Sequence, residues 1–109
     1  MSQEANTWAA GLVADTQRIK IWLAGYISNL TEIPDKDIDM HAAFDCYGFD
    51  SYQGVVMTCE LGEWLGLDLD PSDVFDHPSI HELAEYLVTQ PKIRSALQRF
   101  TETAAVGQG

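Results

Sequence analysis

The chain has 109 residues, enough for one domain with a buried core and too few for two. Its formal net charge of −11, from 17 acidic and 6 basic residues, argues against a nucleic-acid ligand, because such a surface repels phosphates. No apolar run is long enough to span a membrane, and "MSQEANTWAA" lacks the features of a secretory signal. We therefore expect a cytoplasmic protein whose two cysteines, Cys46 and Cys59, stay reduced.

The first predicted helix lies in "RIKIWLAGYISNL" and starts as early as Thr7, where Trp8 and Leu12 continue its apolar side. Apolar residues recur there at a spacing of three and four, which marks one side of a helix: Ile19, Trp22, Leu23, Tyr26, Ile27 and Leu30. We expect this side to be buried, and residues 1–10 to form an N-terminal tail whose last residues can already belong to this helix.

A long loop is expected next, in "TEIPDKDIDMHAAFDCYGF". Three apolar residues should anchor it to the domain: Ile33, Ile38 and Phe44. The spacing of Asp35, Asp37 and Asp39 is that of a calcium loop. We nevertheless expect no calcium site, because Met40 and Cys46 stand where the loop needs glycine and a closing glutamate.

The second helix should run from Ser51 to Leu65 and stop at Gly66. Asp50 is the expected N-cap, with Gln53 able to reach back as in a capping box. We expect five of its residues to face the core: Val55, Met57, Leu61, Trp64 and Leu65. Three others form a second stripe, which is either a docking surface or part of a wide core face: Tyr52, Val56 and Cys59. Gly54 and Gly62 should each cost this helix about 1 kcal/mol relative to alanine.

Two more helices are predicted before Pro91. "DPSDVF" indicates a short one, with Asp70 as cap, Pro71 at its first position and Asp73 favoured by the positive helix end. In "PSIHELAEYLVTQP", Ser79 and Glu82 form a capping box. Its apolar stripe comprises Ile80, Leu83, Ala84, Leu87 and Val88.

His77 and His81 are four residues apart, but His77 precedes the helix, so we expect no metal site.

The segment 91–109 differs in character, because "KIRSALQRF" holds half of the bases with Ile93, Leu97 and Phe100 at helical spacing. It is either an extra helix packed loosely on the domain or a linker or docking segment for a neighbouring domain, and we expect "TETAAVGQG" to be disordered. No alternating strand pattern occurs. The predicted class is all-α, with three longer helices and one short helix.

The acidic charge is concentrated in the middle of the chain. Between Lys36 and Lys92 there are twelve Asp and Glu and no Lys or Arg. Such a segment either keeps the protein in solution or docks partners with basic surfaces, since complementary fields speed encounter.

Ser51 has none of the neighbours that a nucleophilic serine needs: no G-x-S-x-G pattern, no preceding strand and no histidine nearby in sequence. As the first residue of a helix its hydroxyl faces water, and a phosphate attached there would lie near unpaired N–H groups. The position therefore suits a carried phosphate better than an attacking oxygen.

The stretch "FDCYGFDSYQGVVMTCELGEWLGLDLDPSDVFDHPSIHELAEYL" resembles the carrier proteins of polyketide, fatty-acid and nonribosomal peptide synthesis. Their pattern is F-x-x-x-G-x-D-S, an apolar helix, L-G-x-x-L-x-P, and F-x-x-P-[ST]-I-x-x-L-A-x-x-L. The resemblance implies a four-helix bundle over residues 11–90, with a long loop between its first two helices. It also implies a non-catalytic, monomeric carrier domain.

By the same resemblance, a phosphopantetheinyl transferase attaches 4′-phosphopantetheine from coenzyme A to Ser51, with Asp50 contributing to recognition. Acyl groups are then held as thioesters on the thiol of that arm. Partner enzymes are expected to dock on the adjoining surface, formed by Tyr52, Val56, Cys59, Glu60 and Glu63.

The run "YGFDSYQGVVMTCELGEWLG" is most similar to carriers of modular polyketide synthases, including those loaded by acyl-AMP ligases, which act in secondary metabolism. A ketosynthase and an acyltransferase or acyl-AMP ligase are the implied partners. Tyr52 and Phe49 depart from the family's usual leucine, so the fit to particular partners is open. Two alternatives remain: a peptidyl carrier domain, or an acidic helical interaction module without a prosthetic group.

Overall fold

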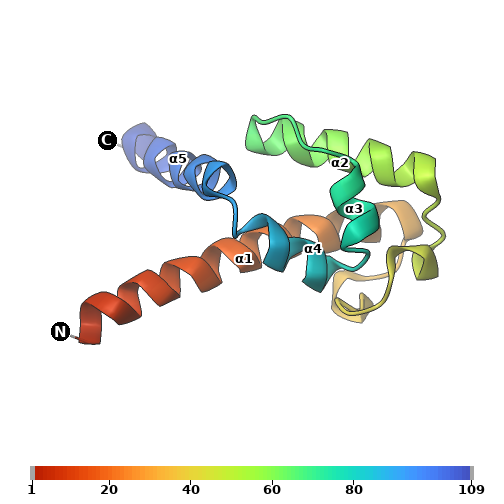
Figure 1. Cartoon of the computed structure of the whole chain (residues 1–109), viewed down its shortest axis with the longest axis horizontal. Coiled ribbons are helices and arrows are strands. Elements are labelled where there is room, and N and C mark those ends of the chain that lie inside the picture. Colours follow the sequence, from red (N-terminus) through yellow and green to blue (C-terminus); the bar gives the residue numbers. More distant parts are fainter. Residues whose placement is uncertain (1, 109) are drawn as a thin grey trace.

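The fold consists of helices, the first two joined by a long loop, in a computed structural model that describes the backbone of residues 2–108 and the side chains of residues 14–99 (Figure 1). Its helices are α1 (Ser2–Thr31), α2 (Ser51–Leu65), α3 (Ser72–Asp76), α4 (Ile80–Leu87) and α5 (Pro91–Gln108). Two 3₁₀ turns, η1 (Asp35–Asp37) and η2 (Phe44–Tyr47), lie in the loop between α1 and α2. Over the described backbone the only β-type pairing is an isolated bridge between Ala43 and Ser79, so the all-α prediction is confirmed.

Helix α1 is longer than its apolar stripe predicted, because its backbone is helical from Ser2, through the stretch that was expected to be a tail. Three of its stripe residues, Ile19, Leu23 and Ile27, are fully buried, while Trp22 and Tyr26 pack against the core at its edge. Leu30 was predicted to be buried and is 48% exposed. It lies in the last turn of α1, where the chain leaves the helix at Glu32 with a φ of 64°.

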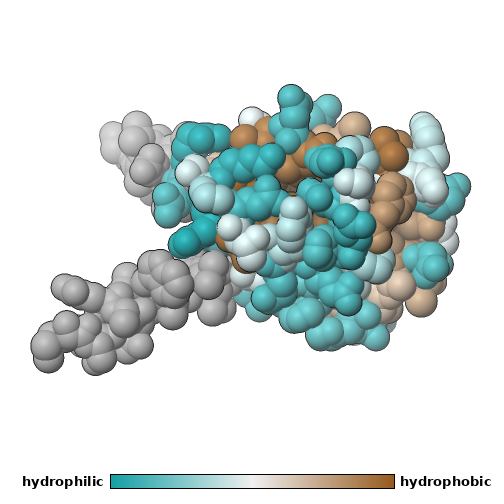
Figure 2. Space-filling model, viewed as in Figure 1, coloured by the Kyte–Doolittle hydropathy of each residue, from teal (hydrophilic) through white to brown (hydrophobic). Residues whose placement is uncertain are grey.

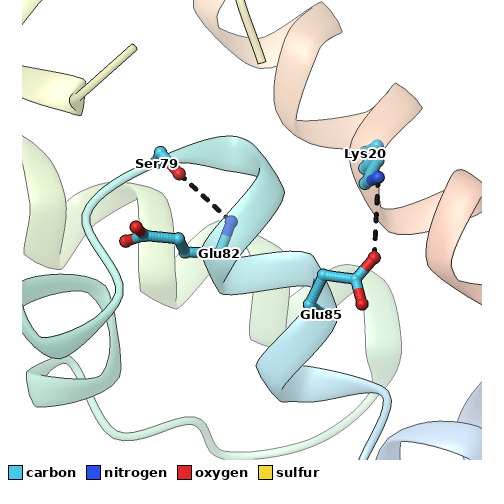
Figure 3. Close-up of polar contacts among 4 residues, drawn as sticks. All are labelled: Lys20, Ser79, Glu82 and Glu85. Carbon is cyan, nitrogen blue, oxygen red and sulfur yellow. Dashed lines mark hydrogen bonds and ion pairs between the residues drawn. The ribbon is translucent and has the colours of Figure 1, made fainter. Parts of the chain in front are cut away.

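The core is formed where α1, α2, α4 and α5 meet. Its largest fully buried side chains from the middle of the chain are Met57, Leu61, Leu65, Ile80, Leu83 and Leu87. The α4 stripe is confirmed in full, since Val88 and Ala84 are buried as well. The Ser79 hydroxyl accepts a hydrogen bond from the Glu82 N–H at 3.1 Å, and the Lys20 ammonium lies 3.7 Å from the Glu85 carboxylate, which joins α1 to α4 (Figure 3).

Helix α5 corrects two expectations. It is not loosely packed, because Ile93, Ala96 and Leu97 are fully buried and Arg18 donates a hydrogen bond to the Leu97 carbonyl at 3.1 Å. Nor is the C-terminal stretch an unstructured tail, because the helix continues to Gln108. No proline or glycine occurs between Lys92 and Val106, so nothing in that stretch breaks the helix. Phe100, predicted on the same stripe, lies outside the described side chains.

The loop between α1 and α2 is anchored as predicted. Ile38 and Phe44 are buried and Ile33 packs against the core. Backbone bonds tie the loop to the start of α4: the Phe44 N–H donates to the Pro78 carbonyl (2.7 Å), and the His81 N–H donates to the Met40 carbonyl (2.8 Å). The loop is therefore held against the end of the bundle where α2 begins.

The short helix α3 begins at Ser72, one residue later than predicted, with Pro71 at its N-cap in the right-handed helical region. Asp70 acts near its start, because its carboxylate accepts a hydrogen bond from the Ser72 N–H at 2.9 Å, and this bond lowers the pKa of Asp70. Asp73 lies in the first turn of α3, as predicted. Burial and the nearby Asp70 charge raise the pKa of its carboxyl.

Candidate functional site

Ser51 lies at the first position of α2 and is exposed. Gly48, in the left-handed region with φ 82°, ends the preceding 3₁₀ turn, and the chain is extended at Asp50. The Asp50 carboxylate accepts a hydrogen bond from the Gln53 N–H at 2.9 Å, so the predicted N-cap is confirmed. Helix geometry leaves the N–H groups of Ser51 and Tyr52 without intrahelical partners at this end of α2.

The predicted capping box is only half formed. The side chain of Gln53 does not reach back to Asp50; its amide instead donates a hydrogen bond to the Tyr26 hydroxyl of α1 at 3.1 Å. Tyr26 of α1 thus offers the Gln53 amide a competing acceptor. Residue spacing near Asp50 could not have predicted this bond, because Tyr26 is distant from Gln53 in the sequence.

The surface of α2 next to Ser51 is more apolar than the sequence indicated. Tyr52 is 74% exposed, and Cys59 is exposed and Val56 half-buried, as a second stripe requires. Val55 was predicted to face the core and is 38% exposed. Val55 is exposed because each residue advances about 100° around a helix, which turns Val55 away from the side on which Gly54 is buried. Glu60 and Glu63 are exposed on the same helix.

A groove of about 450 Å³ opens beside Ser51, between the loop, α2 and α3. Its apolar walls come from Phe44, Phe49, Val74, Phe75 and Pro78, and its rim includes the acids Asp45 and Asp50. Phe75 is 50% exposed, although it stands in the core-like sequence "DVF". In Figure 2 apolar surface (brown and tan) gathers at the end of the molecule where Figure 1 places the start of α2.

Sequence reasoning did not assign Phe75 and Val55 to the site. A five-residue helix such as α3 is too short to show which side faces the core, so no periodicity marked Phe75 as exposed. Val55 lies at the boundary between the buried and exposed sides of α2, where a helical wheel cannot predict whether a side chain is buried or exposed.

The two glycines of α2 have different surroundings. A Cβ at Gly62 would lie 2.6 Å from the Leu67 carbonyl oxygen, so the chain after α2 approaches the helix too closely for a side chain. A Cβ at Gly54 would meet Phe75 at an ordinary 3.5 Å. The glycine at position 62 is therefore required by packing, despite its low helix propensity.

The remaining reactive side chains do not converge on Ser51. Cys46 and Cys59 are free and exposed. His77 stacks on Tyr86 with ring centroids 4.2 Å apart, and His81 lies 4.4 Å from His41. Among the described residues, no group of three histidine, cysteine or acidic side chains is placed to hold a metal ion, and no helix is long and apolar enough to cross a membrane.

The sequence pattern of the family described as "Phosphopantetheine attachment site" matches residues 22–87. This match covers the core of the bundle from α1 to α4, including the start of α2. The chain belongs to this family, the phosphopantetheine-binding carrier domains. Its relatives are polyketide synthase carrier domains and acyl carrier proteins, so the predicted family and prosthetic group are confirmed.

Two curated relatives illustrate the similarity. The chain is 31% identical over 72 residues to the acyl carrier protein TtuC of Teredinibacter turnerae, covering 66% of this chain and 83% of that protein. It is 32% identical over 87 residues to the polyketide synthase PksN of Bacillus subtilis, covering 80% of this chain. It spans only 2% of PksN, so that synthase's activities are not attributes of this chain.

Solved structures show the same fold. An acyl carrier protein from Anabaena sp. PCC 7120, Asl1650, is 31% identical with a TM-score of 0.64, covering 68% of this chain and 84% of that one. A free-standing peptidyl carrier protein from Acinetobacter baumannii is 27% identical with a TM-score of 0.62, covering 68% of this chain and 92% of that one. The predicted helical carrier bundle is thus confirmed, with α5 as a fifth helix.

Proposed function

We propose that Ser51 is the attachment point for 4′-phosphopantetheine and that the domain carries acyl intermediates of polyketide type. The observation that carries the proposal is an exposed serine hydroxyl at the start of α2, beside the Asp50 cap and an open apolar groove. The residues that line this groove include the carboxylates of Asp45 and Asp50 and no histidine.

The residues around Ser51 fit such a group. A phosphodiester on the hydroxyl would lie at the positive end of α2, near N–H groups of the first turn. The groove walls of Phe44, Phe49 and Phe75 offer apolar surface to a chain attached beside them. When bound, the arm supplies a terminal thiol that holds an acyl group as a thioester. A mobile tether delivers that acyl group to several active sites at high effective concentration.

Polyketide-type cargo is favoured over aminoacyl cargo by the relatives. The matches to polyketide synthases and to an acyl carrier protein are 31–32% identical for PksN and TtuC, against 27% for the peptidyl carrier structure. A peptidyl carrier is the second candidate, because a peptidyl carrier structure is also similar, at the lower identity. The enzyme that loads the modified protein distinguishes them: an acyltransferase or acyl-AMP ligase for the first, an amino-acid-activating enzyme for the second.

Partner enzymes are proposed to dock on the exposed side of α2 that adjoins Ser51. Apolar contact would come from Tyr52, Val56 and Cys59, joined by Val55 and Phe75. Charge contact would come from Glu60 and Glu63, which are exposed beside them. Enzymes with a basic rim around an apolar patch fit this surface, including the phosphopantetheinyl transferase and a ketosynthase.

The experiment is to incubate the purified chain with coenzyme A and a promiscuous phosphopantetheinyl transferase and to record the intact mass. We expect the gain of one phosphopantetheine, lost in Ser51→Ala. Ser72→Ala is the matched control, since Ser72 is also exposed at the first position of a helix, and it should still be modified. No gain by the wild-type chain, under conditions that modify a known carrier, would instead support the unmodified interaction module.

A further inference from the structure

One hydroxyl group, that of Tyr26, joins α1 to the functional side of α2. Its oxygen accepts a hydrogen bond from the Gln53 side-chain amide at 3.1 Å, and its O–H donates to the Glu60 carboxylate at 3.1 Å. Gln53 and Glu60 are seven residues apart, so two helical turns place them on the same side of α2. Tyr26 therefore bridges both ends of the segment over which Val56 and Cys59 are displayed.

Aromatic packing fixes the position of this hydroxyl. The Tyr26 ring stacks on Trp22 with centroids 5.4 Å apart and meets Phe49 edge to face at 6.4 Å. Trp22 in turn stacks on Trp64 of α2 at 5.9 Å. A tyrosine ring held on two sides has little freedom left, so the hydroxyl is preorganised by the aromatic cluster.

Gln53 is held at both its ends. Its backbone N–H donates to Asp50 and its side-chain amide donates to Tyr26, so Ser51 belongs to a turn that is fixed from both directions. Burial and the adjoining Glu60 carboxylate raise the pKa of Tyr26. Its O–H is protonated at neutral pH in any case and can donate to Glu60. Glu60 remains exposed while it accepts this bond.

We infer that Tyr26 is a positioning residue for docking beside the attachment site, which presents the Glu60 carboxylate in a fixed place to a cationic side chain of the modifying transferase. The inference rests on the proposed function of Ser51. A charge that is already held in place loses less conformational freedom when a partner binds. Removing the Tyr26 hydroxyl should therefore weaken docking and leave the transfer step itself unchanged.

The test uses the unmodified full chain, coenzyme A and the transferase, with kcat and KM for the chain measured separately. Tyr26→Phe keeps the ring and its packing but removes both hydrogen bonds. We expect its KM to rise about two- to fivefold, the range of a single exposed charge contact, with kcat unchanged. Glu60→Gln should raise KM similarly. The KM of the double variant should be no higher than that of the more affected single variant, since both changes abolish the same contact, that of a fixed Glu60 carboxylate with the transferase.

Tyr47→Phe is the matched control, because the Tyr47 hydroxyl also makes two hydrogen bonds, to the N–H and the carbonyl of Asp39 at 2.8 and 3.0 Å. It lies in the loop, and KM should not change. Equilibrium affinity for the transferase, measured by titration calorimetry on the unmodified variants, should follow KM. Raising the salt concentration should reduce the difference between wild type and Tyr26→Phe.

Three results would overturn the inference: an unchanged KM in Tyr26→Phe, additive effects of Tyr26→Phe and Glu60→Gln, or an equal rise in Tyr47→Phe. Each of them presupposes that the wild-type chain is modified. A wild-type chain that takes up no phosphopantetheine would refute the proposed function itself, so the two failures are distinguishable.

Discussion

At the scale of single residues, backbone approach decides which glycines are required. The Leu67 carbonyl oxygen lies 2.6 Å from the place that a Cβ at Gly62 would occupy, whereas no atom lies within 4 Å of one at Gly25. Both residues are inside helices, so helix propensity alone would favour alanine at each by about 1 kcal/mol. Alanine substitutions at these two positions therefore distinguish the effect of helix propensity from the effect of packing.

We expect Gly62→Ala to destabilise the fold by about 1–3 kcal/mol, the usual cost of forcing atoms into a packed place. Gly25→Ala should be neutral or stabilise the fold by up to about 1 kcal/mol. Urea unfolding followed by circular dichroism gives both free energies. If Gly62→Ala were as stable as the wild type, the segment after α2 would have to move away from the helix at little cost.

At the scale of helices, α5 belongs to the folded unit. Leu97 is fully buried, and its carbonyl accepts a hydrogen bond from Arg18 of α1. The Arg94 guanidinium lies 3.6 Å from the Asp15 carboxylate, which adds a second contact between the same two helices. A chain that ended before α5 would expose the side chains that this helix covers.

Leu97→Ala should therefore cost about 2–5 kcal/mol of unfolding free energy, as for other leucines removed from a core. Gln98→Ala, one residue further on an exposed position, is the control and should change it by less than about 0.5 kcal/mol. Thermal or urea unfolding measures both. A small effect of Leu97→Ala would mean that α5 packs loosely in solution, as the sequence alone suggested.

The helices themselves were predictable where a local signal was strong. Asp50 and Gly66 mark the two ends of α2, and Ser79 marks the start of α4, because capping depends on residues a few positions apart. The attachment turn was predictable for the same reason. The predictions that were wrong or missing concern contacts between distant parts of the chain. The Gln53 side chain donates its hydrogen bond to the Tyr26 hydroxyl, and the exposure of Phe75 depends on how α3 lies against α2.

At the scale of the whole molecule, the charges are divided between two regions. Fourteen of the 17 acids lie between Glu32 and Glu85, with Lys36 as the only base among them, and the other five bases are on α1 and α5. Ion pairs such as Lys20–Glu85 offset little of this excess, since surface pairs contribute about 0–1 kcal/mol each. The folded state therefore carries net repulsion among its acids.

Salt should relieve that repulsion, because the screening length falls from about 30 Å at 0.01 M to about 3 Å at 1 M. We expect the thermal unfolding midpoint to rise as sodium chloride is raised from low to high concentration. The rise should be smaller in a Glu63→Gln, Asp68→Asn double variant, since both side chains are exposed in the acidic region and their loss reduces the repulsion. A midpoint that fell with salt would mean that attractive ion pairs, such as those between α1 and its neighbours, outweigh the repulsion among the acids.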